Sequence, residues 1–224
     1  MSVNVEAYHS IQQEFVKQSV TLVAVSKLKP ASDIEDLYKE GQRDFGENYV
    51  QELVDKQAVL PSTINWHFIG HLQRNKVKQI VGVANIIHGV DSERLLQEIN
   101  KEAEKKQVVQ NILLQYFIAK EETKFGLDAA EIETIVAQKE QYPHVQFLGL
   151  MGMATHTDDQ EQIKAEFDQL ITLKQSLKAR YFKEDAAFSM ASIGMSGDYA
   201  IALAAGASHI RIGSMLFGAR NYTS

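Results

Sequence analysis

A single lysine, Lys27, follows an apolar run and could form a Schiff base with an aldehyde. Residues 20–25 are rich in β-branched and aliphatic side chains, as in a strand buried on both faces, and this run stops at Ser26-Lys27. In α/β folds, ligands collect at the carboxyl ends of the strands. Apolar neighbours disfavour a charged ammonium, so we expect a lowered pKa and a reactive amine at Lys27. A solvated surface charge is the ordinary alternative for any one lysine.

Two glycine-containing segments near the end of the chain could bind a phosphate. Residues 194–198 (GMSGD) and residues 212–214 (IGS) each follow an apolar run and precede a predicted helix. Backbone N–H groups and hydroxyls at such positions can hold a phosphate, and barrels often hold one after their seventh and eighth strands. Each segment could equally be an ordinary helix cap. Together with Lys27, the two segments would supply both anchors of pyridoxal 5′-phosphate.

Other polar residues are expected at the same edge. Arg211 and Gly213 are two positions apart, so strand alternation places them on one face. Arg211 could contact a pyridine nitrogen, which would favour an unprotonated ring and poor transaminase-type chemistry, or it could pair with a carboxylate at the rim. Asn48 could hydrogen-bond a ring substituent, and Glu47 could neutralise Lys27 or an arginine.

The composition argues against several other classes of function. The chain has no cysteine, which excludes disulfides, thiolate catalysis and cysteine-based metal sites. We expect His67 to be a core histidine with a satisfied hydrogen bond. His71 and His156 lack metal-ligand spacing, so we expect no metal. The formal charge is −6, and the Arg74–Lys78 basic cluster is typical of a helix start rather than of a nucleic-acid groove. Because the chain shows no signal peptide and no run near ~18 apolar residues, we expect a cytoplasmic protein.

The elements that must position these residues alternate along the chain. Apolar runs separated by helical stripes occur at residues 20–25, 44–46, 66–69, 86–88, 108–118, 145–151, 188–193 and 209–212. This pattern fits a closed (β/α)₈ TIM barrel better than the alternative, an open doubly wound sheet. An extra amphipathic helix is predicted over residues 3–18, and no linker divides the single domain of residues 1–224. Predicted helix caps are Ser32 with Glu35, Asp91-Ser92, Asp128 with Glu131, and Asp198.

Seven motifs, in order and at the expected spacing, resemble the YggS/PROSC family. They are residues 24–27 with Pro30, residues 45–52, 66–76, 124–127, 149–153 and 194–198, and residues 211–214 with Phe217-Gly218, so the resemblance covers about residues 20–220. It implies a pyridoxal phosphate homeostasis protein with an alanine-racemase-like barrel. In that barrel Lys27 would carry the Schiff base and Arg211 would face the pyridine nitrogen. Ser196, Gly197, Gly213 and Ser214 would lie at or near the phosphate, and Asn48 and Met195 would line the cofactor. Ile193 departs from the methionine expected after Ser192.

The resemblance implies a carrier or regulator of the cofactor without established turnover. Alanine-racemase-type enzymes place a tyrosine from an additional β-domain of the partner subunit opposite the lysine, and we expect no such domain within 224 residues. The expected partners are pyridoxal phosphate and, transiently, apo-enzymes that use it, with no nucleic acid and no membrane, and we expect a monomer. The alternatives are a pyridoxal-phosphate-dependent amino-acid racemase or lyase, or a Schiff-base aldolase without a cofactor.

Overall fold

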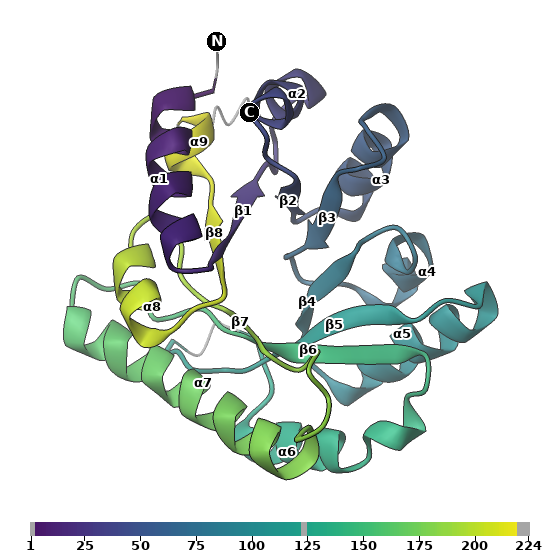
Figure 1. Ribbon diagram of the computed structural model, residues 1–224. Coiled ribbons are helices and arrows are strands. Elements are labelled where there is room, and N and C mark those ends of the chain that lie inside the picture. Colours follow the sequence, from purple (N-terminus) through teal and green to yellow (C-terminus); the bar gives the residue numbers. More distant parts are fainter. Residues whose placement is uncertain (1–2, 122–124, 219–224) are drawn as a thin grey trace.

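Eight parallel strands close into a barrel in the computed structural model, which describes residues 3–121 and 125–218 (Figure 1). Each strand pairs with the next one in sequence, and β8 pairs with β1 to close the ring. The strands are β1 (Thr21–Val25), β2 (Asp44–Glu47), β3 (Asn65–Phe68), β4 (Ile86–Val90), β5 (Gln110–Gln115), β6 (Val145–Met151), β7 (Met190–Ser192) and β8 (His209–Ile212). The prediction of a (β/α)₈ barrel is confirmed.

Helices surround the barrel and connect its strands (Figure 1). They are α1 (Val5–Lys17), α2 (Ala31–Lys39), α3 (Val50–Val59), α4 (Val77–Ile80), α5 (Glu93–Lys106), α6 (Ala129–Ala137), α7 (Gln160–Tyr181), α8 (Tyr199–Ala205) and α9 (Ser214–Phe217), with 3₁₀ turns at Arg74–Lys76 and Lys139–Gln141. The predicted N-terminal helix is α1, which packs beside α9, and the Asn4 N–H donates to the Leu216 carbonyl at 2.8 Å. None of the described helices combines the length and the apolarity that a membrane crossing requires.

Two of the predicted caps form as expected, and two do not. Asp128 and Glu131 make a complete capping box at the start of α6, and Ser92 accepts from the Leu95 N–H at the start of α5. The capping box predicted for Ser32 is wrong, because α2 already begins at Ala31 after Pro30, whose φ of −67° suits a helix start. Asp198 precedes α8 but makes no side-chain cap to it; its carboxylate accepts instead from the Met195 N–H at 2.5 Å.

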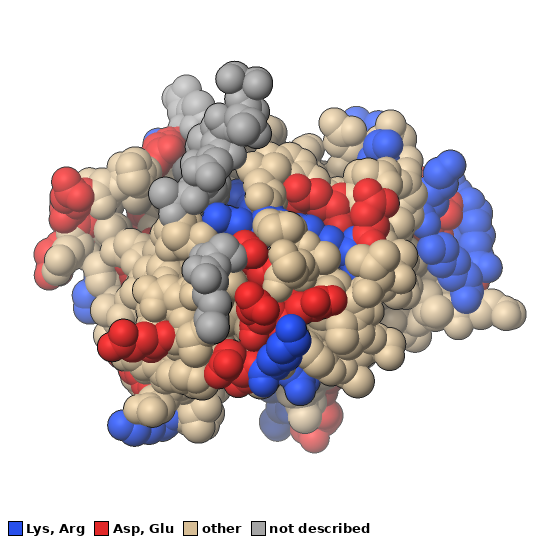
Figure 2. Space-filling model, turned by 90° about the horizontal axis from the view of Figure 1, so that it is seen from above, with Lys and Arg blue, Asp and Glu red and all other residues tan. Residues whose placement is uncertain are grey.

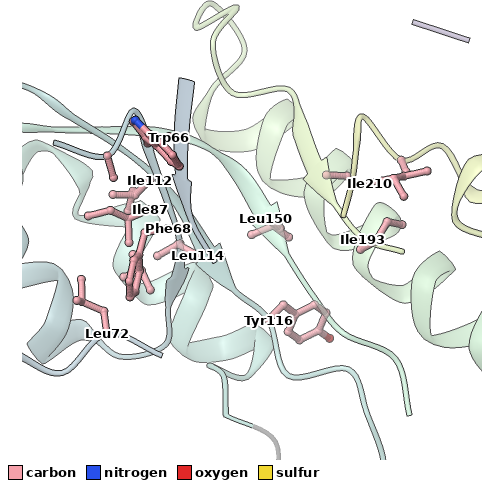
Figure 3. Packing of buried hydrophobic residues seen from close by; sticks show 14 of the residues in the cluster. Trp66, Phe68, Leu72, Ile87, Ile112, Leu114, Tyr116, Leu150, Ile193 and Ile210 are labelled. Atoms are coloured by element: carbon pink, nitrogen blue, oxygen red, sulfur yellow. The ribbon is translucent and has the colours of Figure 1, made fainter. Parts of the chain in front are cut away.

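Most of the apolar core lies between the barrel and its helices. Outward-facing strand residues such as Phe68, Ile87 and Ile112 gather there, and Figure 3 shows them with Trp66 and Leu114 in the same cluster. A second, smaller cluster is made by Ile86, Leu113, Leu148 and Met151. Successive strand residues point to opposite faces, so Ile86 and Ile87 belong to different clusters, and the smaller one fills part of the barrel interior.

Two strand predictions are longer than the strands that form. β5 covers residues 110–115 instead of 108–118, and β7 covers residues 190–192 instead of 188–193. Phe188 lies two residues before β7 begins. It is buried there and stacks on Phe182, with the ring centroids 4.0 Å apart. An apolar residue at this position therefore predicts burial but not membership of the strand. The length of the strand is set by how many of its residues hydrogen-bond to a neighbouring strand.

Candidate functional site

A cavity of about 440 Å³ opens at the carboxyl ends of β1, β2 and β8. It is lined by all eight residues that the sequence predicts for the site, namely Lys27, Asn48, Met195, Ser196, Gly197, Arg211, Gly213 and Ser214. Four further lining residues are Val25, Ile69, Met153 and His156. The fold thus brings together residues from the first strand and the last, which are far apart in sequence.

A larger cavity, about 600 Å³, lies between the starts of α5 and α6. Its lining includes four carboxylates (Asp91, Glu93, Asp128 and Glu131), one cation (Arg94) and no lysine. The excess of negative charge disfavours a phosphate, and no amine is present to form a Schiff base, so the size of this cavity does not make it the better candidate. Figure 2 shows acidic and basic side chains mixed in the middle of one face, with a further basic group at its right edge.

The residue after Lys27 is held by helix α3. Leu28 has a φ of +60°, a left-handed conformation that is uncommon for a branched side chain. Its backbone N–H donates to both carboxylate oxygens of Glu52, at 3.0 and 3.2 Å. These contacts stabilise the sharp turn after β1 and so orient the half-buried Lys27 toward the cavity.

The residue before Lys27 is held by a buried ion pair. The Ser26 hydroxyl donates to Glu47 Oε1 at 2.6 Å, and Lys56 Nζ donates to the same oxygen at 2.7 Å and to the Ser26 carbonyl at 2.9 Å. The expectation that Glu47 neutralises Lys27 or an arginine is therefore wrong, because Lys56 of α3 is its partner. Burial raises the pKa of Glu47 to about 7, although the charge of Lys56 opposes this rise.

The segment of residues 194–198 folds into a tight loop whose backbone faces the cavity. Gly194 has a φ of +86°, and the Met195 N–H is tied to the Asp198 carboxylate. A Cβ added to Gly197 would meet no atom within 4 Å, so the space beside this backbone is open. Just after β8, a Cβ at Gly213 would lie 3.3 Å from Val25 Cβ, so a glycine here allows the chain to pass close to β1 beside the cavity.

Arg211 is 5% exposed and lies in the wall of the same cavity. One of its terminal nitrogens donates to the Ser192 carbonyl and to Ser192 Oγ, both at 2.7 Å, and the other donates to the Gly152 carbonyl at 3.1 Å. Burial lowers the pKa of Arg211 to about 10, so the side chain remains a cation at neutral pH. Within residues 3–121 and 125–218 no carboxylate pairs with Arg211, in contrast to the alternative of a rim ion pair, because all three acceptors are neutral. In the same part of the chain, two of the five guanidinium N–H groups have no acceptor and could serve a ligand.

Asn48 carries a buried atom that a ligand could satisfy. Its Oδ1 has no hydrogen-bond partner among the described residues, and such an atom is costly to bury alone. Asn48 also lines the cavity, so a donor on a bound molecule could reach it. This observation agrees with the predicted contact between Asn48 and a ring substituent.

Four lining residues were not predicted for the site. Val25 and Ile69 could have been found from alternation, since each lies two positions beyond an inward-facing residue, Val23 and His67 respectively. Met153 was assigned to core packing, and His156 was considered only as a metal ligand. Lys124, which belongs to one of the family motifs, lies outside the described residues, as does the end of the matched region after residue 218.

Comparisons with known proteins agree with this geometry. The family model for the alanine racemase N-terminal domain matches residues 6–221. The pyridoxal phosphate homeostasis protein of Aquifex aeolicus (strain VF5) is 36% identical over 202 residues, which make up 90% of this chain and 87% of that protein.

Solved structures show the same relationship. PipY of Synechococcus elongatus PCC7942 is 35% identical, and the match covers 95% of this chain and 99% of PipY. The TM-score is 0.89 for PipY without PLP and 0.85 for PipY with PLP bound. The resemblance read from the motifs is confirmed: the chain belongs to the alanine racemase N-terminal domain family and, within it, to the group that includes the pyridoxal phosphate homeostasis proteins.

Proposed function

We propose that this chain binds pyridoxal 5′-phosphate as a Schiff base on Lys27, and that it buffers and delivers the cofactor inside the cell. One observation carries the proposal: a single cavity contains a lysine, two small-residue loops and a buried arginine in the arrangement that the cofactor needs. The names of the relatives and the PLP-bound form of PipY support it.

The residues present fit each part of the cofactor. The space beside Gly197 and the hydroxyls of Ser196 and Ser214 suit a phosphate, which needs several donors. The free N–H groups of Arg211 suit a ring nitrogen that carries no proton. The partnerless Oδ1 of Asn48 suits a hydroxyl substituent of the ring.

In the proposed binding step, the amine of Lys27 forms a C=N bond with the aldehyde carbon, and water leaves. Glu52 and the Glu47–Lys56 pair hold the backbone on either side of Lys27, so the turn that carries the amine is formed before the cofactor arrives. Once bound, pyridoxal phosphate supplies an electron sink to amino-acid chemistry. Arg211 limits that capacity, because a cationic donor at the ring nitrogen disfavours its protonation.

Absorbance and mass spectrometry test the binding mode. Purified protein mixed with pyridoxal phosphate should show a visible absorbance band, and borohydride reduction followed by peptide mass spectrometry should locate the added mass on Lys27. Lys27→Ala should lose both signals, whereas Lys78→Ala, which changes an exposed lysine of α4, should keep them. A protein that takes up no cofactor, or one labelled equally well without Lys27, would contradict the proposal.

A racemase or lyase is the second candidate, and His156 favours it. This side chain lines the same cavity as Lys27 and could move a proton in a reaction that needs two groups. Incubation of the loaded protein with amino acids in deuterium oxide distinguishes the candidates. A carrier should incorporate α-deuterium only slowly and independently of His156, while exchange at enzyme-like rates that His156→Ala abolishes would establish turnover.

Delivery would require contact with apo-enzymes. Leu28 and Met195 are 46% and 40% exposed, one next to Lys27 and the other in the cavity wall, so apolar surface is available beside the site. We expect sedimentation analysis to show a monomer. We also expect the loaded protein to activate an apo-enzyme faster than it releases the cofactor to a trap in solution. Equal rates would show release without delivery.

A further inference from the structure

Inside the barrel, a chain of hydrogen bonds connects the cavity with the amino end of β2. Arg211 donates to Ser192 Oγ at 2.7 Å, and Ser192 Oγ lies 3.0 Å from His88 Nδ1. His88 Nε2 lies 2.8 Å from His67 Nδ1, and His67 Nε2 lies 3.0 Å from Asp44 Oδ1. Five side chains from β2, β3, β4, β7 and β8 thus form one continuous row.

When both rings are neutral, the carboxylate end of this row determines the direction of every hydrogen bond, and the guanidinium end is compatible with it. A guanidinium only donates and a carboxylate only accepts. Asp44 therefore requires a proton on His67 Nε2, which leaves His67 Nδ1 to accept from His88 Nε2–H. His88 Nδ1 then accepts the hydroxyl hydrogen of Ser192, whose lone pair receives the Arg211 N–H. With both rings neutral, each of the four bonds is satisfied in the same direction, from Arg211 to Asp44.

The surroundings favour a neutral His88. This side chain is fully buried, and burial, followed by the nearby His67, Arg211 and His209, holds the pKa of His88 well below its usual range. The hydrogen bond from His67 holds the pKa of Asp44 below its usual range, against the opposing effect of burial. The other titratable groups near the row are His209, whose pKa burial lowers to about 4, and Asp198, which faces Arg211.

The row also explains how a cation is tolerated in the barrel wall. Arg211 touches only neutral acceptors, and the apolar side of the interior is occupied by Ile86, Leu113, Leu148 and Met151. Aligned hydrogen bonds polarise one another, so the row transmits the attraction of the Asp44 carboxylate to the guanidinium across the barrel.

We propose that Asp44, His67 and His88 are positioning residues for Arg211, acting through Ser192 to orient the guanidinium toward the ligand in the cavity. The inference rests on the proposed function only in naming that ligand as pyridoxal phosphate. The hydrogen-bond row is a property of the unloaded protein and can be tested without it.

Histidine tautomers in the cofactor-free protein provide the first test. Long-range ¹H–¹⁵N correlation spectra at neutral pH should show His67 and His88 as neutral rings protonated at Nε2, with assignments from His67→Gln and His88→Gln. Asp44→Leu removes the acceptor that requires a proton on His67 Nε2, so the Nδ1–H form should become populated in both rings. Asp44→Asn keeps an acceptor oxygen and should keep the Nε2–H form. A charged ring, or a ring protonated at Nδ1 in the unmodified protein, would overturn the proposal.

Affinity for pyridoxal phosphate provides the second test. Asp44→Leu and Ser192→Ala should each weaken binding on the order of tenfold, as expected when an outer hydrogen-bond partner is lost, and Asp44→Asn should lie close to the unmodified protein. Ser192→Ala should leave the tautomers of both histidines unchanged, because Asp44 still sets the direction of the hydrogen bonds. If Asp44→Leu does not fold, Ser192→Ala becomes the decisive variant. Unchanged affinity in Ser192→Ala would refute the positioning role. If the unmodified protein binds no pyridoxal phosphate, the proposed function fails, while the tautomers still decide whether the row exists.

Discussion

The buried pair beneath Lys27 leads to a prediction about stability and pH. Lys56→Met keeps most of the side-chain volume and removes the amine that lies 2.7 Å from Glu47 Oε1. Glu47 is fully buried, so its carboxylate would then lack a cation, and it would remain protonated in the folded protein to a higher pH.

The size of the effect follows from the pKa of Glu47. This pKa is raised from 4.5 to about 7 in the folded protein. A carboxyl group with a raised pKa contributes stability that is present below its unfolded pKa and is lost as the pH rises to its folded pKa. In the unmodified protein this loss ends near pH 7. In Lys56→Met the loss of stability should continue above pH 7, because the pKa of Glu47 is raised further. Between about pH 7 and pH 8.5 this additional loss amounts to about 2 kcal/mol.

Chemical denaturation between about pH 5 and pH 8.5 measures this difference. At the acid end Glu47 is protonated in both proteins, so Lys56→Met should cost only about 1 kcal/mol, mainly from the lost hydrogen bond to the Ser26 carbonyl. The double variant Lys56→Met/Glu47→Gln lacks the carboxyl group whose pKa is raised, although Glu52 remains nearby, and it should show no extra loss of stability above pH 7. If the stabilities of Lys56→Met and the unmodified protein run parallel over the whole range, the pair has no electrostatic role and the reasoning is refuted.

Three further predictions concern the cavity and the barrel. Gly197→Ala should leave the free energy of unfolding nearly unchanged, because its Cβ would meet no atom, yet it should weaken pyridoxal phosphate binding by filling the phosphate space; equal affinity in a titration would place the phosphate elsewhere. Arg211→Glu should increase α-deuterium incorporation into amino acids by the loaded protein, because a carboxylate allows ring protonation; an unchanged or lower rate would count against the contact with the ring. Gly149→Ala should reduce the free energy of unfolding by at least about 2 kcal/mol, because a Cβ there would lie 1.9 Å from the Met190 carbonyl oxygen and the φ is +149°; a loss below about 0.5 kcal/mol would show that β6 and β7 adjust.

The barrel and the members of the site could be predicted from local patterns. Apolar runs separated by helical stripes give the strand count, and alternation correctly places Arg211 of β8 and Gly213 just after it in the lining of one cavity. Spacing alone was insufficient for caps: Asp128 with Glu131 forms a capping box, whereas Ser32 with Glu35 has equivalent spacing and does not, because Pro30 starts the helix earlier.

The partners of buried polar groups could not be predicted in the same way. Glu47 and Lys56 are on different elements, and nothing in the sequence distinguishes Lys56 from the solvated lysines around it. His67 was correctly expected to have a satisfied hydrogen bond, but its partners His88 and Asp44 come from two other strands. Such pairs depend on strand register and barrel closure, which are set by the whole fold.

The seam between β1 and β8 has a consequence for how the protein matures in the cell. Lys27 follows the first strand of the barrel, while Gly213 and Ser214 follow the last, so one anchor leaves the ribosome before most of the barrel and the other after it. Helix α1 packs on α9, so it can make this contact only after α9, which follows β8, has been synthesised. Capture of the cofactor through both anchors therefore requires that β8 has been synthesised and has paired with β1, and a bound ligand would then oppose opening of the ring at this junction.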